Sequence, residues 1–139
     1  MLIPKNISVY ETPTAYHWVD GGIMCSKTKP VERSMEGYTL AMDYYKKKVE
    51  ARGGVKLCLL ADSIHAGKMT KEVREYVDKE ITKYFNALAV LSDKPLESSL
   101  VNLFLKISWK RFPIRLFTNE IEAREWLKEF ILPPASLTQ

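Results

Sequence analysis

Short apolar stretches separated by turn residues open the chain. Residues 7–11 and 16–19 are rich in β-branched and aromatic side chains, which favour strands. Asp20-Gly21-Gly22 separates the second stretch from a third one, and Asp-Gly suits the positive-φ positions of a tight turn between antiparallel strands. We therefore expect an antiparallel meander that ends near Lys27, with Pro13 interrupting it between the first two strands.

Beyond the meander, the apolar spacing alternates between helix and strand periods. Steps of three and four predict helices from about Ser34 or Thr39 to Arg52 and at 70–84, 96–107 and 119–131. Nearly continuous apolar runs at 55–61 and 87–91 are typical of strands covered on both faces, and 114–117 is a short strand. Capping and stop residues support these boundaries. They are Gly53-Gly54, Thr70, and Asn119 with Glu122.

The element order predicts an α/β fold. An antiparallel hairpin and meander is followed by α-β-α-β-α-β-α, and such alternation implies right-handed crossovers and parallel pairing. The sheet is therefore mixed, with helices covering it. The 139 residues suit one domain, which we place at residues 1–132, with a flexible tail at 133–139 after Pro133-Pro134.

Composition narrows the class further. With 46% hydrophobic and 27% charged residues, the chain is an ordinary globular protein rather than a disordered one. The net charge of +4 comes from 21 basic and 17 acidic residues spread along the chain, which favours solvated faces over a dedicated nucleic-acid binder. Cys25 and Cys58 lack metal-site or redox spacing, so we expect buried, reduced thiols. The sequence shows no leader peptide and no membrane span, and we expect a cytoplasmic protein.

The second half of the chain carries its most specific pattern. Residues 112–118 read F-P-I-R-L-F-T and residues 123–127 read A-R-E-W-L. Together with the strand ending at Asp62 and the run 102–106, this pattern resembles a family of small bacterial STAS-like proteins, mostly of unknown function. The resemblance spans about residues 14–131. The wider group includes the STAS domains of anti-sigma factor antagonists and the related CRAL-TRIO lipid carriers, which implies a STAS-like mixed sheet with helices.

The resemblance also directs attention to the loop after the central strand. In the anti-sigma factor antagonists this loop leads to an Asp-Ser pair at a helix N-terminus, where a kinase phosphorylates the serine. With Asp62 matched to the family's strand-end aspartate, Thr70-Lys71 stands where that pair would be. Two interpretations follow: Thr70 only caps the helix, or Thr70 or Ser63 accepts a phosphate. The candidate partner- or ligand-binding residues are Asp62, Ser63, His65, Lys68, Thr70 and Lys71.

Catalytic and metal motifs are missing from the sequence. We expect His17, in an alternating strand, to be a surface or half-buried residue. His65 lies beyond the end of the central strand, where open α/β sheets gather ligands, but no nucleophile elbow accompanies it and Ser63. Neither phosphate-binding glycine loops nor zinc spacings occur, so we expect no enzyme activity, no cofactor and no metal.

One local concentration of basic and aromatic residues remains. It lies around Trp109 and Phe112 and could contact polyanions or an anionic membrane surface. Alternatively, the segment is a solvated connection whose two aromatic rings pack on the core. The basic residues concerned are Lys106, Lys110, Arg111 and Arg115. Other aromatic residues lie on apolar helix stripes and are expected in the core. They are Tyr44, Tyr45, Tyr76, Tyr84 and Trp126.

These observations lead to three functional hypotheses. The first is a non-enzymatic regulatory or protein-interaction module that uses the loop from Asp62 to Thr70, with a protein partner or self-association. The second is binding of a small molecule or lipid in a pocket near His65. The third, weak binding of a polyanion such as nucleic acid, is the least favoured of the three.

Overall fold

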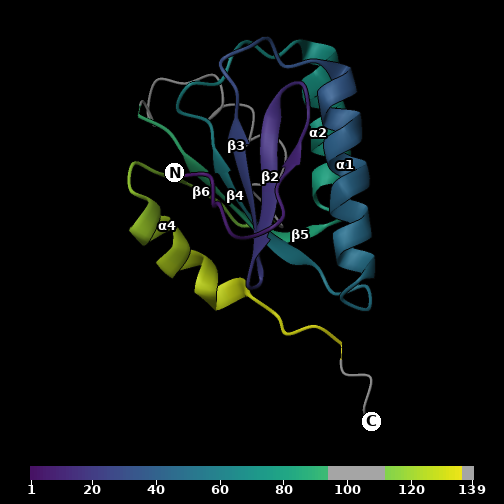
Figure 1. Ribbon diagram of the computed structural model, residues 1–139, viewed down its shortest axis with the longest axis vertical. Helices are drawn as coiled ribbons and strands as arrows, with labels where there is room; N and C mark the ends of the chain where they lie inside the picture. Colours follow the sequence, from purple (N-terminus) through teal and green to yellow (C-terminus); the bar gives the residue numbers. More distant parts are fainter. Residues whose placement is uncertain (94–111, 136–139) are drawn as a thin grey trace.

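A six-stranded mixed sheet forms the centre of the computed structural model, which describes residues 1–93 and 112–135 (Figure 1). Its strands follow one another across the sheet in chain order. The first three strands form an antiparallel meander. The third strand also pairs parallel with the fourth, and the remaining strands continue this parallel pairing. The strands are β1 (Tyr10–Glu11), β2 (Ala15–Asp20), β3 (Ile23–Thr28), β4 (Leu57–Asp62), β5 (Phe85–Leu91) and β6 (Ile114–Phe117). This confirms the predicted meander and the predicted change to parallel pairing.

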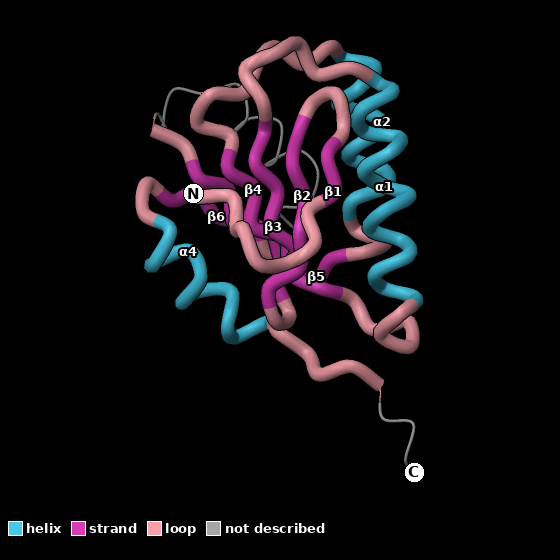
Figure 2. The backbone as a smooth tube through the Cα atoms, in the orientation of Figure 1, coloured by secondary structure: helices cyan, strands magenta, loops and turns pink. Residues whose placement is uncertain are grey.

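Helices cover the two faces of the sheet unequally (Figures 1 and 2). Helices α1 (Met35–Glu50) and α2 (Lys71–Ile81) lie together on one face, while α4 (Glu120–Leu127) lies on the other. Successive right-handed crossovers that move across a sheet in one direction place their helices on the same side. A short 3₁₀ helix, η1 (Lys128–Phe130), follows α4. The helix expected at 96–107 lies outside the described residues.

Element boundaries differ from the expected ones by a few residues. The first strand shrinks to Tyr10–Glu11, and β5 begins at Phe85 rather than at residue 87. Phe85 pairs with Leu57 in the neighbouring strand and is only 1% exposed, so strand pairing extends β5 past the local apolar run. The two-residue turn between β2 and β3 has Gly21 at φ 63°, a region that glycine enters without strain.

Alternation along β4 divides the core into two layers. Successive side chains of a strand point to opposite faces, so Leu57 and Leu59 pack towards α1 and α2, whereas Cys58 and Leu60 pack towards α4. All four are buried. Cys25 and Cys58 are free and buried, as expected, and burial raises the pKa of each thiol to about 11. The strand predicted to be covered on both faces is therefore the middle of the molecule.

His17 corrects one expectation. It is not a surface or half-buried residue, because it is only 2% exposed and lies among aromatic rings between β2 and α1. Its Nδ1 shares a hydrogen bond of 3.0 Å with the Tyr45 hydroxyl, while Nε2 has no partner. Of the aromatic side chains expected in the core, Tyr45 is buried. Those that are partly buried against the two layers are Tyr44, Tyr76, Tyr84 and Trp126.

This burial makes the stability of the protein depend on pH. Desolvation lowers the pKa of His17 from 6.5 to about 4, so between these values the unfolded chain binds a proton that the folded chain does not. The free energy of unfolding is therefore unaffected by His17 above pH 6.5. It decreases by about 3 kcal/mol as the pH falls from 6.5 towards 4. Urea unfolding between pH 7 and pH 4 should show this loss in the wild type and a smaller one in His17→Gln.

The second histidine supplies the matched control. His65 is exposed, so His65→Gln should leave the dependence of stability on pH as it is in the wild type. Parallel profiles for the wild type and His17→Gln would contradict the assignment of the loss to His17.

Candidate functional site at the carboxyl ends of the strands

The carboxyl ends of the parallel strands gather two connecting segments at one edge of the sheet, the upper edge in Figure 1. Residues 29–34 lead from β3 into α1, and residues 63–70 lead from β4 into α2. We call these two segments, with the first turn of α2, the strand-end surface. In open α/β sheets this is the edge at which ligands bind. The predicted partner- or ligand-binding residues 62–71 all lie on it or directly beneath it.

The two segments hold one another through their backbones. The amide of Arg33 donates to the carbonyl of Lys68 at 2.9 Å, and Arg33 forms a parallel bridge with Met69. Gly67 lies so close to the other segment that an added Cβ would be 2.0 Å from the Val31 carbonyl oxygen. Because Arg33 precedes the start of α1 and Met69 precedes the start of α2, this pairing brings the two helix starts together.

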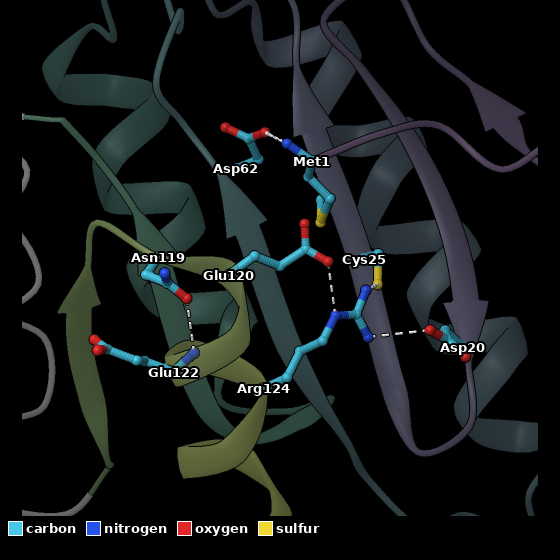
Figure 3. Close-up of polar contacts among 8 residues, drawn as sticks. All are labelled: Met1, Asp20, Cys25, Asp62, Asn119, Glu120, Glu122 and Arg124. Atoms are coloured by element: carbon cyan, nitrogen blue, oxygen red, sulfur yellow. Dashed lines mark hydrogen bonds and ion pairs between the residues drawn. The ribbon is translucent and has the colours of Figure 1, made fainter.

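Side-chain caps begin both helices. The Ser34 hydroxyl accepts from the amide of Gly37 at 3.1 Å, and the Thr70 hydroxyl accepts from the amide of Val73 at 3.3 Å. The predicted cap at Thr70 is thus confirmed, as is that of Asn119, which accepts from Glu122 at 3.1 Å (Figure 3). Thr70 is also exposed; its phosphorylation stays a prediction.

Asp62 is buried and ion-paired. Its Oδ2 lies 3.1 Å from the amino group of Met1, with side-chain exposures of 6% for Asp62 and 1% for Met1 (Figure 3). Its Oδ1 accepts from the amide of Ile64 at 3.2 Å, and Lys27 donates to the carbonyl of Met1 at 2.8 Å. The Asp62 carboxylate therefore holds the end of β4 to the first residue of the chain. The side chains that face solvent at the strand-end surface belong to the loop that follows β4.

The remaining predicted residues are spread over the surface. Ser63 is half-buried and its amide donates to Leu91 at 3.0 Å, whereas His65 and Lys68 are exposed. Lys71 is exposed and lies 3.8 Å from Glu75. Within residues 1–93 and 112–135, the structure contains no group of three or more His, Cys, Asp or Glu that could hold a metal ion. The Asp62 side chain contacts Met1 and the amide of Ile64, and no hydrogen bond joins it to the side chain of Ser63 or His65, so these three residues do not form a triad.

The basic concentration is described only in part. Lys106, Lys110 and Arg111 lie outside the described residues. Arg115 is exposed on β6, where its guanidinium lies 5.2 Å from the centre of the Phe117 ring. Phe112 packs partly buried against the layer of α1 and α2, as expected for an aromatic residue of a connecting segment. Polyanion binding stays a prediction.

A second polar cluster joins α4 to the hairpin (Figure 3). Arg124 donates to Glu120 at 2.9 Å and to Asp20 at 3.0 Å, and it lies 3.5 Å from the sulfur of Cys25. Burial outweighs the neighbouring guanidinium and raises the pKa of the Cys25 thiol to about 11, so this thiol is protonated at neutral pH and is a poor nucleophile. The cluster fastens α4 to the sheet.

Three residues at this edge of the sheet make contacts that no sequence pattern predicts. Met1 pairs with a residue 61 positions away, and no local pattern indicates such a contact. Gly67 lies in the loop between β4 and α2 and approaches the Val31 backbone; a glycine at such a place is a signal of close backbone approach. Arg33 lies in the polar connection between β3 and α1 and is nevertheless only 4% exposed.

With this geometry, the structure defines an α/β protein of the STAS-like, or SpoIIAA-like, class. A crystal structure of an uncharacterized protein from the DUF3478 family with a SpoIIAA-like fold, from Shewanella loihica PV-4, is similar with a TM-score of 0.59. The similarity covers 90% of this chain and 98% of that one at 11% sequence identity, so it shows the fold alone.

The family follows from the sequence itself. Residues 17–131 match the model of a family described as Domain of unknown function (DUF7793), and the chain belongs to that family. The matched span agrees with the extent of the resemblance noted from the sequence. No curated protein matches the chain. Among the described residues, no helix is both long and apolar enough to span a membrane.

The buried ion pair of Asp62 yields a stability prediction. Asp62→Asn leaves the partly buried amino group of Met1 without its charge partner, and because breaking a fully buried pair costs about 3 kcal/mol or more, we expect a loss of up to about 3 kcal/mol. Urea unfolding at pH 7 measures the loss. Asp20→Asn, which removes an exposed partner of Arg124, is the control and should cost less than about 1 kcal/mol. Equal losses in the two variants would show that the Asp62 pair is not specially stabilising.

The close approach of Gly67 to the segment at 29–34 yields a second prediction about stability. In Gly67→Ala the new methyl group meets the backbone of residues 31 and 32, which cannot rotate away as a side chain would, so we expect a loss of about 1–3 kcal/mol. Amide hydrogen exchange should accelerate at Arg33, whose hydrogen bond joins the two segments. Ala66→Gly, which changes the same loop without adding bulk, should leave exchange at Arg33 close to that of the wild type. Unchanged protection of the Arg33 amide in Gly67→Ala would contradict the prediction that the added methyl group pushes the two segments apart.

Proposed function

We propose that the protein is a non-catalytic regulatory or interaction module that binds a partner protein through the strand-end surface. The observation that supports this most directly is the backbone bracing of the loop at 63–69 by the segment at 29–33. A loop held in one conformation loses little conformational entropy on binding, which favours recognition. The exposed side chains that it presents are those of His65, Lys68, Thr70 and Lys71.

The chemistry of this surface fits recognition better than catalysis. The strand-end carboxylate of Asp62 is engaged by Met1 and by the amide of Ile64, and the Thr70 hydroxyl is engaged as a helix cap. Lys68 and Lys71 contribute positive charge, and Glu32 and Glu72 contribute negative charge nearby, all on exposed side chains. A polar rim of mixed charge is typical of protein-binding surfaces and sets specificity and association rate.

The alternative of an apolar ligand has less support in the described residues. His65, around which the pocket was expected, is exposed. Beneath the loop, the described side chains of β4 and β5 are packed on both faces by the two core layers. These contacts favour a protein partner over an apolar ligand.

Partner capture with matched variants tests it. The His-tagged wild type, a loop variant (His65→Ala with Lys68→Ala) and a control variant (Glu125→Ala with Lys128→Ala, an exposed pair on the far face) are used to capture proteins from a lysate of the native source. We expect a protein retained by the wild type and the control but lost from the loop variant, because only that variant removes exposed contact groups. Mixing the purified partner with each variant in size-exclusion chromatography then checks direct binding.

Self-association is measured with the same proteins. Sedimentation of the wild type over a range of concentrations should show a dimer that the loop variant weakens if the partner is a second copy. A wild type that is monomeric throughout and retains no protein in a loop-dependent way would contradict the proposal.

A further inference from the structure

Arg33 is a buried cation without an acidic partner among the described residues. The residue is only 4% exposed, and the hydrogen bond that its guanidinium makes to a described residue runs from Nη1 to the Tyr38 hydroxyl at 3.4 Å. Its Nε has none. Burial raises the pKa of Tyr38 despite the neighbouring guanidinium, so this phenol is neutral and does not offset the charge. Buried charges are normally paired, and Arg33 has no such pair within residues 1–93 and 112–135.

The surroundings of Arg33 add positive potential rather than remove it. The backbone bridge between Arg33 and Met69 brings the start of α1, with its cap at Ser34, beside the start of α2, with its cap at Thr70. The helices have 16 and 11 residues. The N-terminus of a helix carries partial positive charge and unsatisfied amides, so two such ends lie close to the backbone of Arg33.

Nearby carboxylates do not complete the site. Glu36 and Glu72 lie in the first turns of the two helices, where they offset part of the helix potential. Both are exposed, and the described residues place no carboxylate oxygen within ion-pair distance of the Arg33 guanidinium. The arrangement therefore has a positive region to which a separate anion can contribute the missing charge.

We propose that Arg33 binds a phosphoryl group at the junction of the two helix starts. The guanidinium fork matches two phosphate oxygens, and the free amides of the helix starts favour the same group. A phosphate also carries close to two negative charges, more than a carboxylate supplies. The source is either free inorganic phosphate or the phosphate end of a small monoester. This site is independent of the proposed protein partner, because its ligand binds to the purified chain alone.

Thermal unfolding in increasing phosphate at constant ionic strength tests the site. Sodium chloride replaces phosphate in the reference samples. A ligand that binds only the folded state should raise the melting temperature of the wild type by about 4 °C at ten times its Kd. A parallel series with glycerol phosphate distinguishes the two sources: a larger rise than with inorganic phosphate assigns the site to a monoester, and an equal or smaller rise assigns it to free phosphate.

Three variants separate binding from structure. Arg33→Met removes the charge but keeps a side chain of similar length; it should lose the response to phosphate and, in chloride, melt no lower than the wild type, because an unpaired buried charge is removed. Arg33→Lys keeps the charge without the fork and should bind about tenfold more weakly. Arg74→Met, which removes an α2 arginine beside Asp78, should respond as the wild type does.

Calorimetric titration of the folded wild type with inorganic phosphate and with glycerol phosphate provides a readout that does not depend on how the variants fold. Binding of either ligand supports the site. Absence of binding of both up to about 20 mM, or an equal response to phosphate in the wild type and Arg33→Met, would overturn the proposal. Neither result bears on loop-dependent capture of a protein partner, so the two proposals fail separately.

Discussion

Strand β4 must be covered on both faces, and the rest of the structure depends on this constraint. Its side chains alternate between two buried layers, so Leu59 requires α1 and α2 on one side while Leu60 requires α4 on the other. Burial of large apolar side chains on both sides is the main source of stability for a chain of this size. Because helices cover both faces of β4, the exposed polar groups lie at the strand ends and in the connecting segments that follow them.

Two buried charged side chains near the strand ends differ in whether they have a charge partner among the described residues. The carboxylate of Asp62 has an ion pair with Met1 and a backbone amide, whereas the guanidinium of Arg33 has one long hydrogen bond to a neutral phenol. A paired buried charge is structural, while an unpaired one carries an energetic cost that a ligand can relieve. The same edge therefore combines a buried ion pair, an exposed loop and a cation that has no acidic partner among the described residues. These features underlie the two proposals made above.

Local signals were enough for the order of elements and for part of this site. Periodicity placed both buried strands and the helix starts, and Thr70 was identified as a cap because capping requires only neighbours three residues away. Asp62 is a candidate site residue through the family resemblance, which matches it to a strand-end aspartate. Its burial against Met1, the burial of Arg33 and the burial of His17 were not foreseen, because each depends on residues that are distant in the sequence or on packing that a polar residue type does not indicate.

The sequence by itself determined the α/β class, the antiparallel start, the parallel pairing that follows it and the edge at which the loops gather, since hydrophobic period and crossover handedness are local or general properties. The tertiary structure alone decided which polar groups are buried, which of them are paired, and how closely Gly67 approaches Val31. Those features follow from distances between segments that meet only after the chain has folded. For that reason, the residues on which the phosphate proposal rests emerge only from the folded arrangement.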